Sequence, residues 1–64
     1  MNYEEILSMD ANMVLSILNM KLRDEFSSLD MLCEDFNVSK EKIKDKMKEI
    51  GYVYSEEKNQ FTVI

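Results

Sequence analysis

The chain contains no histidine and no proline, and it has one cysteine and one glycine among its 64 residues. Because Cys33 has no second cysteine to pair with, an internal disulfide is excluded, and without histidine a Cys/His zinc site lacks its ligands. Gly51 alone is too little for a glycine-rich phosphate loop. A histidine base that titrates near neutral pH is missing as well. We therefore predict a protein that is not an enzyme and uses no metal, no cofactor and no small-molecule substrate.

Long apolar runs are also missing. No stretch approaches the roughly 20 apolar residues of a membrane span, and Glu4 and Glu5 argue against the basic start of a signal peptide. A chain of this length buries only about 60% of its unfolded surface, so a core without disulfides or metal often depends on a second copy. We expect one globular domain over residues 1–64, a cytoplasmic location and a homodimer.

Positive charge is scarce in the first part of the chain. The net charge is −5. Lys21 and Arg23 are the only basic residues among residues 1–38, which hold eight acidic ones, whereas residues 39–64 carry six lysines and five acids. Neither part resembles the basic surface that nucleic acid selects.

The residue pattern predicts a mainly α chain (α+β) that ends in a β-hairpin. Helices are expected at about 3–8, 11–24, 28–36 and 39–50, and strands at about 52–54 and 60–64, where aromatic and β-branched residues gather. Asn2 and Glu5 have the spacing of a capping box, and Asp10, Ser27 and Ser39 stand where helices begin. Three further residues suit a left-handed backbone at turns: Asn37, Gly51 and Asn59.

The third and fourth helices have the register of a helix-turn-helix. The first of the pair offers Leu29, Leu32 and Phe36 to a core, with the small Cys33 at the crossing point, where we expect a buried thiol. After the turn at Asn37, the apolar residues are Val38, Ile43, Met47 and Ile50. With the hairpin behind it, this register predicts a winged-helix-like domain.

The fourth helix carries charges that do not suit DNA. On a helical wheel Glu41, Asp45 and Glu49 face away from the apolar side, where a DNA-reading helix would meet phosphates and bases. Three lysines lie together on one side of this acidic face, and they are the candidate nucleic-acid contacts if the domain does bind DNA: Lys40, Lys44 and Lys48.

The second helix has an unusually wide apolar surface. A narrow polar stripe contains Asn12, Ser16, Asn19 and Arg23, and the apolar arc spans roughly 200°, against about 100° for an ordinary surface helix. One interpretation is a central helix wrapped by the other elements. The other is a helix that meets a partner, and its candidate interface consists of Met13, Ile17 and Met20 with the polar Asn19 and Arg23.

Three segments carry a resemblance to a known family. They are Asn-Met-Lys-Leu-Arg-Asp at residues 19–24, the stretch 29–32, and Asn-Gln-Phe at residues 59–61. Together they resemble a family of very short bacterial proteins of unknown function. Members often have proline after the aspartate that caps the main helix, where this chain has Ala11. The resemblance implies a bacterial, cytoplasmic protein; it implies no activity, and no site residues transfer.

The sequence therefore favours a non-enzymatic protein-interaction module on a helix-turn-helix scaffold, with a homodimer or another protein as its partner. The alternative is a DNA-binding transcriptional regulator of the winged-helix type.

Overall fold

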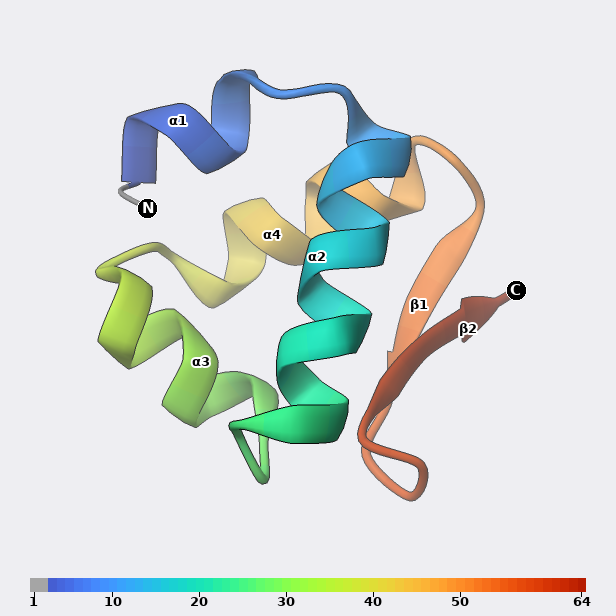
Figure 1. Cartoon of the computed structure of the whole chain (residues 1–64). Coiled ribbons are helices and arrows are strands. Elements are labelled where there is room, and N and C mark those ends of the chain that lie inside the picture. Colours follow the sequence, from blue (N-terminus) through green and yellow to red (C-terminus); the bar gives the residue numbers. More distant parts are fainter. Residues whose placement is uncertain (1–2) are drawn as a thin grey trace.

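The computed structural model describes residues 3–64, with side chains from residue 5 onward, as four helices followed by two strands (Figure 1). The elements are α1 (Tyr3–Ser8), α2 (Ala11–Asp24), α3 (Leu29–Phe36), α4 (Lys40–Lys48), β1 (Tyr52–Ser55) and β2 (Gln60–Val63). The strands form an antiparallel hairpin in which Tyr54 lies opposite Phe61. The predicted class, mainly α with a C-terminal β-hairpin, is confirmed.

Side chains at the helix starts explain where the helices begin. The carboxylate of Asp10 accepts hydrogen bonds from the backbone N–H groups of Asn12 (3.0 Å) and Met13 (3.3 Å), as predicted for a helix cap. Ser39 caps α4 in the same way, since its hydroxyl accepts from the N–H of Lys42 at 3.4 Å. The prediction of a capping box at Asn2 lies outside the described residues.

The start of α3 differs from the prediction by one residue. Ser28, rather than Ser27, is the cap, because its hydroxyl accepts from the backbone N–H of Met31 at 3.2 Å. The hydroxyl of Ser27 instead donates to the sulfur of Met31 at 3.0 Å. Two adjacent serines offer equivalent caps locally, and burial of Leu29 inside the core decides between them.

Three left-handed residues set the turns, as the sequence predicts. Asn37 (φ 55°) separates α3 from α4, Gly51 (φ 81°) follows α4, and Asn59 (φ 53°) precedes β2. The helix α4 ends at Lys48, earlier than expected, so that Ile50 lies in the turn and is only half-buried.

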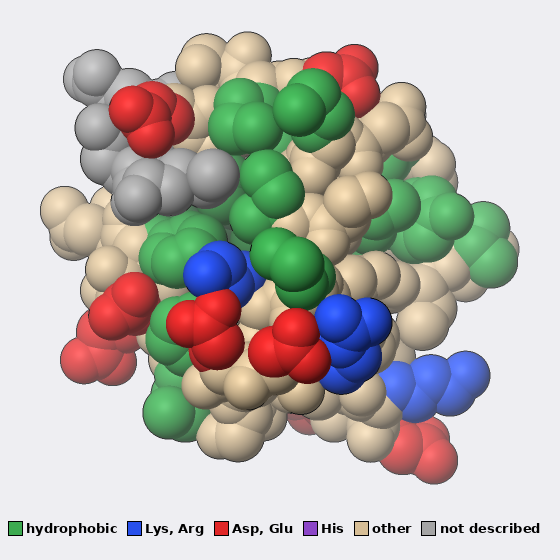
Figure 2. Space-filling view, in the orientation of Figure 1, with side chains coloured by type: hydrophobic (Ala, Val, Ile, Leu, Met, Phe, Trp, Pro, Cys, Tyr) green, Lys and Arg blue, Asp and Glu red, His purple; other side chains and the backbone are tan. Residues whose placement is uncertain are grey.

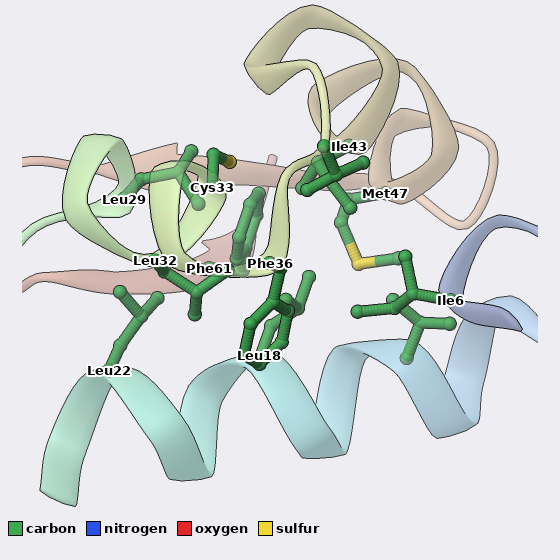
Figure 3. Packing of buried hydrophobic residues seen from close by; sticks show 12 residues of the cluster. Ile6, Leu18, Leu22, Leu29, Leu32, Cys33, Phe36, Ile43, Met47 and Phe61 are labelled. Atoms are coloured by element: carbon green, nitrogen blue, oxygen red, sulfur yellow. The ribbon is translucent and has the colours of Figure 1, made fainter. Parts of the chain in front are cut away.

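The hydrophobic core draws on all four helices and on β2. Leu18 and Leu22 point from α2 toward Leu32 and Phe36 of α3, while Ile6 of α1 faces Met47 of α4 (Figure 3). Six further buried residues complete the described core: Val14, Leu29, Cys33, Val38, Ile43 and Phe61. Among the described residues, every buried side-chain nitrogen or oxygen has a hydrogen-bond partner.

The hairpin lies between two helices, with β2 beside α2 and β1 beside α4. The backbone N–H of Ile64 donates to the carbonyl of Gly51 at 2.9 Å, so these two residues form a hydrogen-bonded pair. In an antiparallel hairpin such pairs alternate with pairs whose backbone groups point away from the partner strand. The backbone groups of Phe61 therefore point outward from β2 toward α2, and those of Tyr52 and Tyr54 point outward from β1. This geometry determines what each edge of the hairpin can bind.

Candidate functional site

The outer face of α2 carries an exposed apolar stripe, formed by Met13, Ile17 and Met20. These residues are spaced i, i+4 and i+7, so they lie on one side of the helix. Met13 is 57% exposed, Met20 is 44% exposed and Ile17 is half-buried, whereas Val14 and Leu18 on the opposite side are fully buried. Figure 2 shows the hydrophobic side chains gathered in a column over α2. The helix is thus packed on one side and uncovered on the other.

Ion pairs border the C-terminal end of this stripe. The Nζ of Lys21 lies 2.6 Å from Glu25, and the guanidinium of Arg23 lies 3.0 Å from Asp24. The hydrogen bond from Arg23 lowers the pKa of the Asp24 carboxyl below its usual value. Both pairs are open to solvent, so they contribute little to folding. Arg23, a predicted partner contact, is exposed beside the stripe and already paired within the chain.

Asn19, the other polar residue predicted to meet a partner, contacts the hairpin instead of solvent. Its side-chain oxygen accepts from the backbone N–H of Phe61 at 2.7 Å, and its side-chain nitrogen donates to the carbonyl of Phe61 at 3.1 Å. The amide therefore pairs with Phe61 as a neighbouring strand would. Gln60 adds a bond from its side-chain nitrogen to the backbone carbonyl of Asn19 at 2.9 Å.

Asn59 fastens the other end of the hairpin to α2. Its side-chain nitrogen donates to the carbonyls of Leu22 (3.0 Å) and Phe26 (2.8 Å), and its oxygen accepts from the hydroxyl of Tyr54 at 2.6 Å. That same Tyr54 hydroxyl accepts from the backbone N–H of Leu29 at 3.1 Å. In the sequence, Asn59 is marked by its turn and by the Asn-Gln-Phe segment, and contacts across 33 to 37 residues leave no local signal.

A groove of about 380 Å³ lies between α4 and β1. Its lining consists of Lys44, Asp45 and Lys48 from α4, residues 52–54 from β1, and Ile64. Val53 is 50% exposed and Ile64 is 75% exposed. The volume falls within the range of small ligand sites, and the lining combines two lysines with an apolar strand. The sequence predicts both the lysines and the aromatic strand, but it does not indicate that the two lie side by side.

The lysines of α4 have different surroundings. Lys40 forms an ion pair with Asp30 of α3 at 2.7 Å, and this hydrogen bond raises the pKa of the Lys40 ammonium. Lys46 donates to the backbone carbonyl of Leu7 at 3.0 Å and so joins α4 to α1. Lys44 and Lys48 are exposed and line the groove. Of the three predicted nucleic-acid contacts, Lys40 is therefore held in an ion pair, whereas Lys44 and Lys48 lie at the groove.

The thiol of Cys33 is buried in the core. Burial raises the pKa of this thiol, and the nearby charge of Asp30 raises it further. Within residues 3–64, no cluster of three or more acidic or cysteine side chains has the arrangement of a metal site. None of the helices in this part of the chain is long and apolar enough to cross a membrane.

The fold and these surfaces define a small α+β domain with one uncovered apolar helix face and one lysine-lined groove. Residues 8–61 match the family model described as Domain of unknown function (DUF4250). The match spans most of the chain, so the chain belongs to this family. No curated protein and no solved structure matches it. Membership of a small family without an assigned function, as the resemblance implied, is confirmed.

Proposed function

We propose that this protein is a non-enzymatic protein-interaction module, built on a helix-turn-helix scaffold, that pairs with a second copy through α2. The observation that carries the proposal is the exposure of Met13 and Met20 on the face opposite the buried Val14 and Leu18. Methionine is an adaptable contact residue, and an uncovered apolar stripe on a small domain is typical of an interface.

The order of residues along the stripe favours a second copy as the partner. The stripe has a methionine at each end and an isoleucine between them, so its order of side chains is nearly the same in both directions along the helix: Met13, Ile17, Met20. Two antiparallel α2 helices related by a twofold axis would bring Met13 of one copy against the partner's Met20, with Ile17 near the axis. Asp10 and Lys21 lie on the same flank, about 20° apart on the wheel. Antiparallel pairing therefore brings Lys21 toward the partner's Asp10.

The size of the stripe sets the expected strength of the dimer. A standard interface buries about 800 Å² on each partner, which is roughly a fifth of the 4216 Å² surface of this chain. A helix of 14 residues is only about 21 Å long and covers part of that area. We therefore expect a weak dimer.

Sedimentation equilibrium between micromolar and millimolar protein tests the proposal. The wild-type chain should shift from monomer to dimer mass, at a salt concentration that screens its net charge of −5. The double variant Met13→Glu, Met20→Glu should stay monomeric. Met31→Glu is the matched control, because Met31 of α3 is 50% exposed and lies outside the stripe. A wild-type chain that remains monomeric at millimolar concentration sinks the proposal.

Duplex DNA binding through α4 is the second candidate function. It is supported by the tight Asn37 turn between α3 and the Ser39-capped α4, followed by a hairpin, which is the element order of a winged helix. Against it stand the exposed Glu41 and Asp45 of the same helix and the exposed Glu49 directly after it. Fluorescence anisotropy with a labelled mixed-sequence duplex at low salt measures this function, and Lys44→Ala with Lys48→Ala should weaken any binding.

A further inference from the structure

We propose that the groove between α4 and β1 binds an extended acidic segment of a partner protein, which adds to β1 as a third strand. This site is separate from the stripe on α2, so it can hold whether or not the protein dimerises there. Its support comes from the open edge of β1, from the spacing of two lysines and from the exposed apolar residues beside them.

The groove runs along β1, and among the described residues no strand pairs with the outer edge of β1. The register turns the backbone N–H and C=O groups of Tyr52 and Tyr54 away from β2. On the far side of the hairpin, Asn19 already occupies the corresponding groups of Phe61 in β2. Strand addition is therefore directed to β1, where main-chain hydrogen bonds supply affinity and side-chain pockets supply specificity.

The lysines of the groove match the side-chain spacing of an extended chain. Lys44 and Lys48 are one helical turn apart, which places them about 6 Å apart along α4. Residues i and i+2 of a strand point the same way and lie about 6.6–6.8 Å apart. Two acidic residues at alternate positions of the added strand can therefore each meet one lysine. Asp45 opposes this attraction, so the side chains that line the groove carry a net charge of +1.

The intervening residues of the segment are expected to be apolar. Side chains on the other face of the added strand would meet Val53 and Ile64, which are exposed at the groove. The predicted ligand is thus a segment with alternating acidic and apolar residues. Charge selects the ligand class, because a basic segment would be repelled by the same pair of lysines.

The test uses the ¹⁵N-labelled full chain and an acetylated, amidated pentapeptide of alternating glutamate and valine. Binding should shift the amide signals of Tyr52 and Tyr54 and slow their hydrogen exchange. A peptide with lysine in place of glutamate should not bind. The double variant Lys44→Glu, Lys48→Glu should bind at least about tenfold more weakly. Lys58→Glu, at the exposed hairpin tip, is the matched control and should bind within about twofold of the wild type.

Backbone methylation distinguishes strand addition from simple charge attraction. One peptide is N-methylated at its odd positions and a second at its even positions. Only alternate N–H groups of an added strand face β1, so one of the two peptides should lose binding and the other should keep it. Equal binding of both peptides, or no binding of the unmethylated one at millimolar concentration, overturns the proposal. Shifts of the same amides by a mixed-sequence duplex alone would assign the groove to nucleic acid instead.

Discussion

The two flanks of α2 use polar and apolar residues in the opposite way to a typical surface helix. On the hairpin side, the polar Asn19 is partly buried and bonded to the backbone of β2, while on the outer side Met13 and Met20 are open to solvent. The polar flank holds the fold together, and the apolar flank is free for a partner. Amphipathic pattern alone therefore does not tell which face of a helix is structural.

The largest effect on stability is expected at Asn59, which fastens the hairpin to the C-terminal end of α2. The variant Asn59→Ala loses three side-chain hydrogen bonds and places alanine at a positive φ. We expect it to lower the free energy of unfolding by about 3 kcal/mol, measured by urea denaturation. Asn59→Gly also loses the side-chain hydrogen bonds but avoids the strain of alanine at a positive φ, so it should be about 1 kcal/mol more stable than Asn59→Ala. If both variants unfold like the wild type, Asn59 does not hold the hairpin.

Asn19→Ala should have the next largest effect, because it leaves the N–H and C=O of Phe61 without their partner on α2. We expect a loss of about 2 kcal/mol in the free energy of unfolding. Hydrogen exchange at the Phe61 amide should also quicken more than exchange elsewhere. Asn12→Ala provides the comparison on the exposed side of the same helix and should change stability by less than about 0.5 kcal/mol. Similar losses for both asparagines would contradict the role given to Asn19.

The apolar flank should contribute little to the stability of the monomer. Replacing Met13 and Met20 together by glutamine is expected to change the free energy of unfolding by less than about 0.5 kcal/mol, when measured at low micromolar protein. By contrast, Leu18→Ala on the buried side should cost about 3 kcal/mol. A loss above about 1 kcal/mol in the methionine variant would show that the stripe belongs to the core.

The smallest effect concerns the ion pair at the end of the stripe. Arg23→Gln removes the hydrogen bond that lowers the pKa of the Asp24 carboxyl, so this pKa should rise toward its usual value in an NMR titration. A lowered folded-state pKa stabilises the fold above the unfolded-state pKa, and this is lost as the pH falls through the folded-state value. Because the pair is fully exposed, the titration should shift while the unfolding midpoint hardly moves. An unchanged Asp24 pKa would show that the pair does not form in solution.

Local signals in the sequence predicted much of the fold. The caps at Asp10 and Ser39 and the left-handed turns at Asn37, Gly51 and Asn59 each depend on neighbouring residues, and all are confirmed. The end of α4 was placed too late because Ile50 continues the apolar spacing, yet the chain already turns toward Gly51.

Contacts between distant residues could not be predicted in the same way. Asn19 bonds to Phe61 across 42 residues, and nothing in the neighbourhood of either residue indicates this pairing. The sequence predicts Asn19 as a partner contact, because a side-chain amide that takes the place of a neighbouring strand leaves no periodic pattern. The groove was missed for the same reason, since it requires α4 and β1 to be placed side by side.

The pairing of Asn19 with Phe61 also has a consequence for aggregation. A two-stranded sheet with two open edges can add chains without limit, as in a growing fibril. Here a side-chain amide occupies the backbone groups of Phe61 on the outer edge of β2, and α2 lies beside that edge, so edge-to-edge growth is directed to β1. If two hairpins paired through their β1 strands, each would occupy the open edge of the other, and the assembly would stop at a dimer.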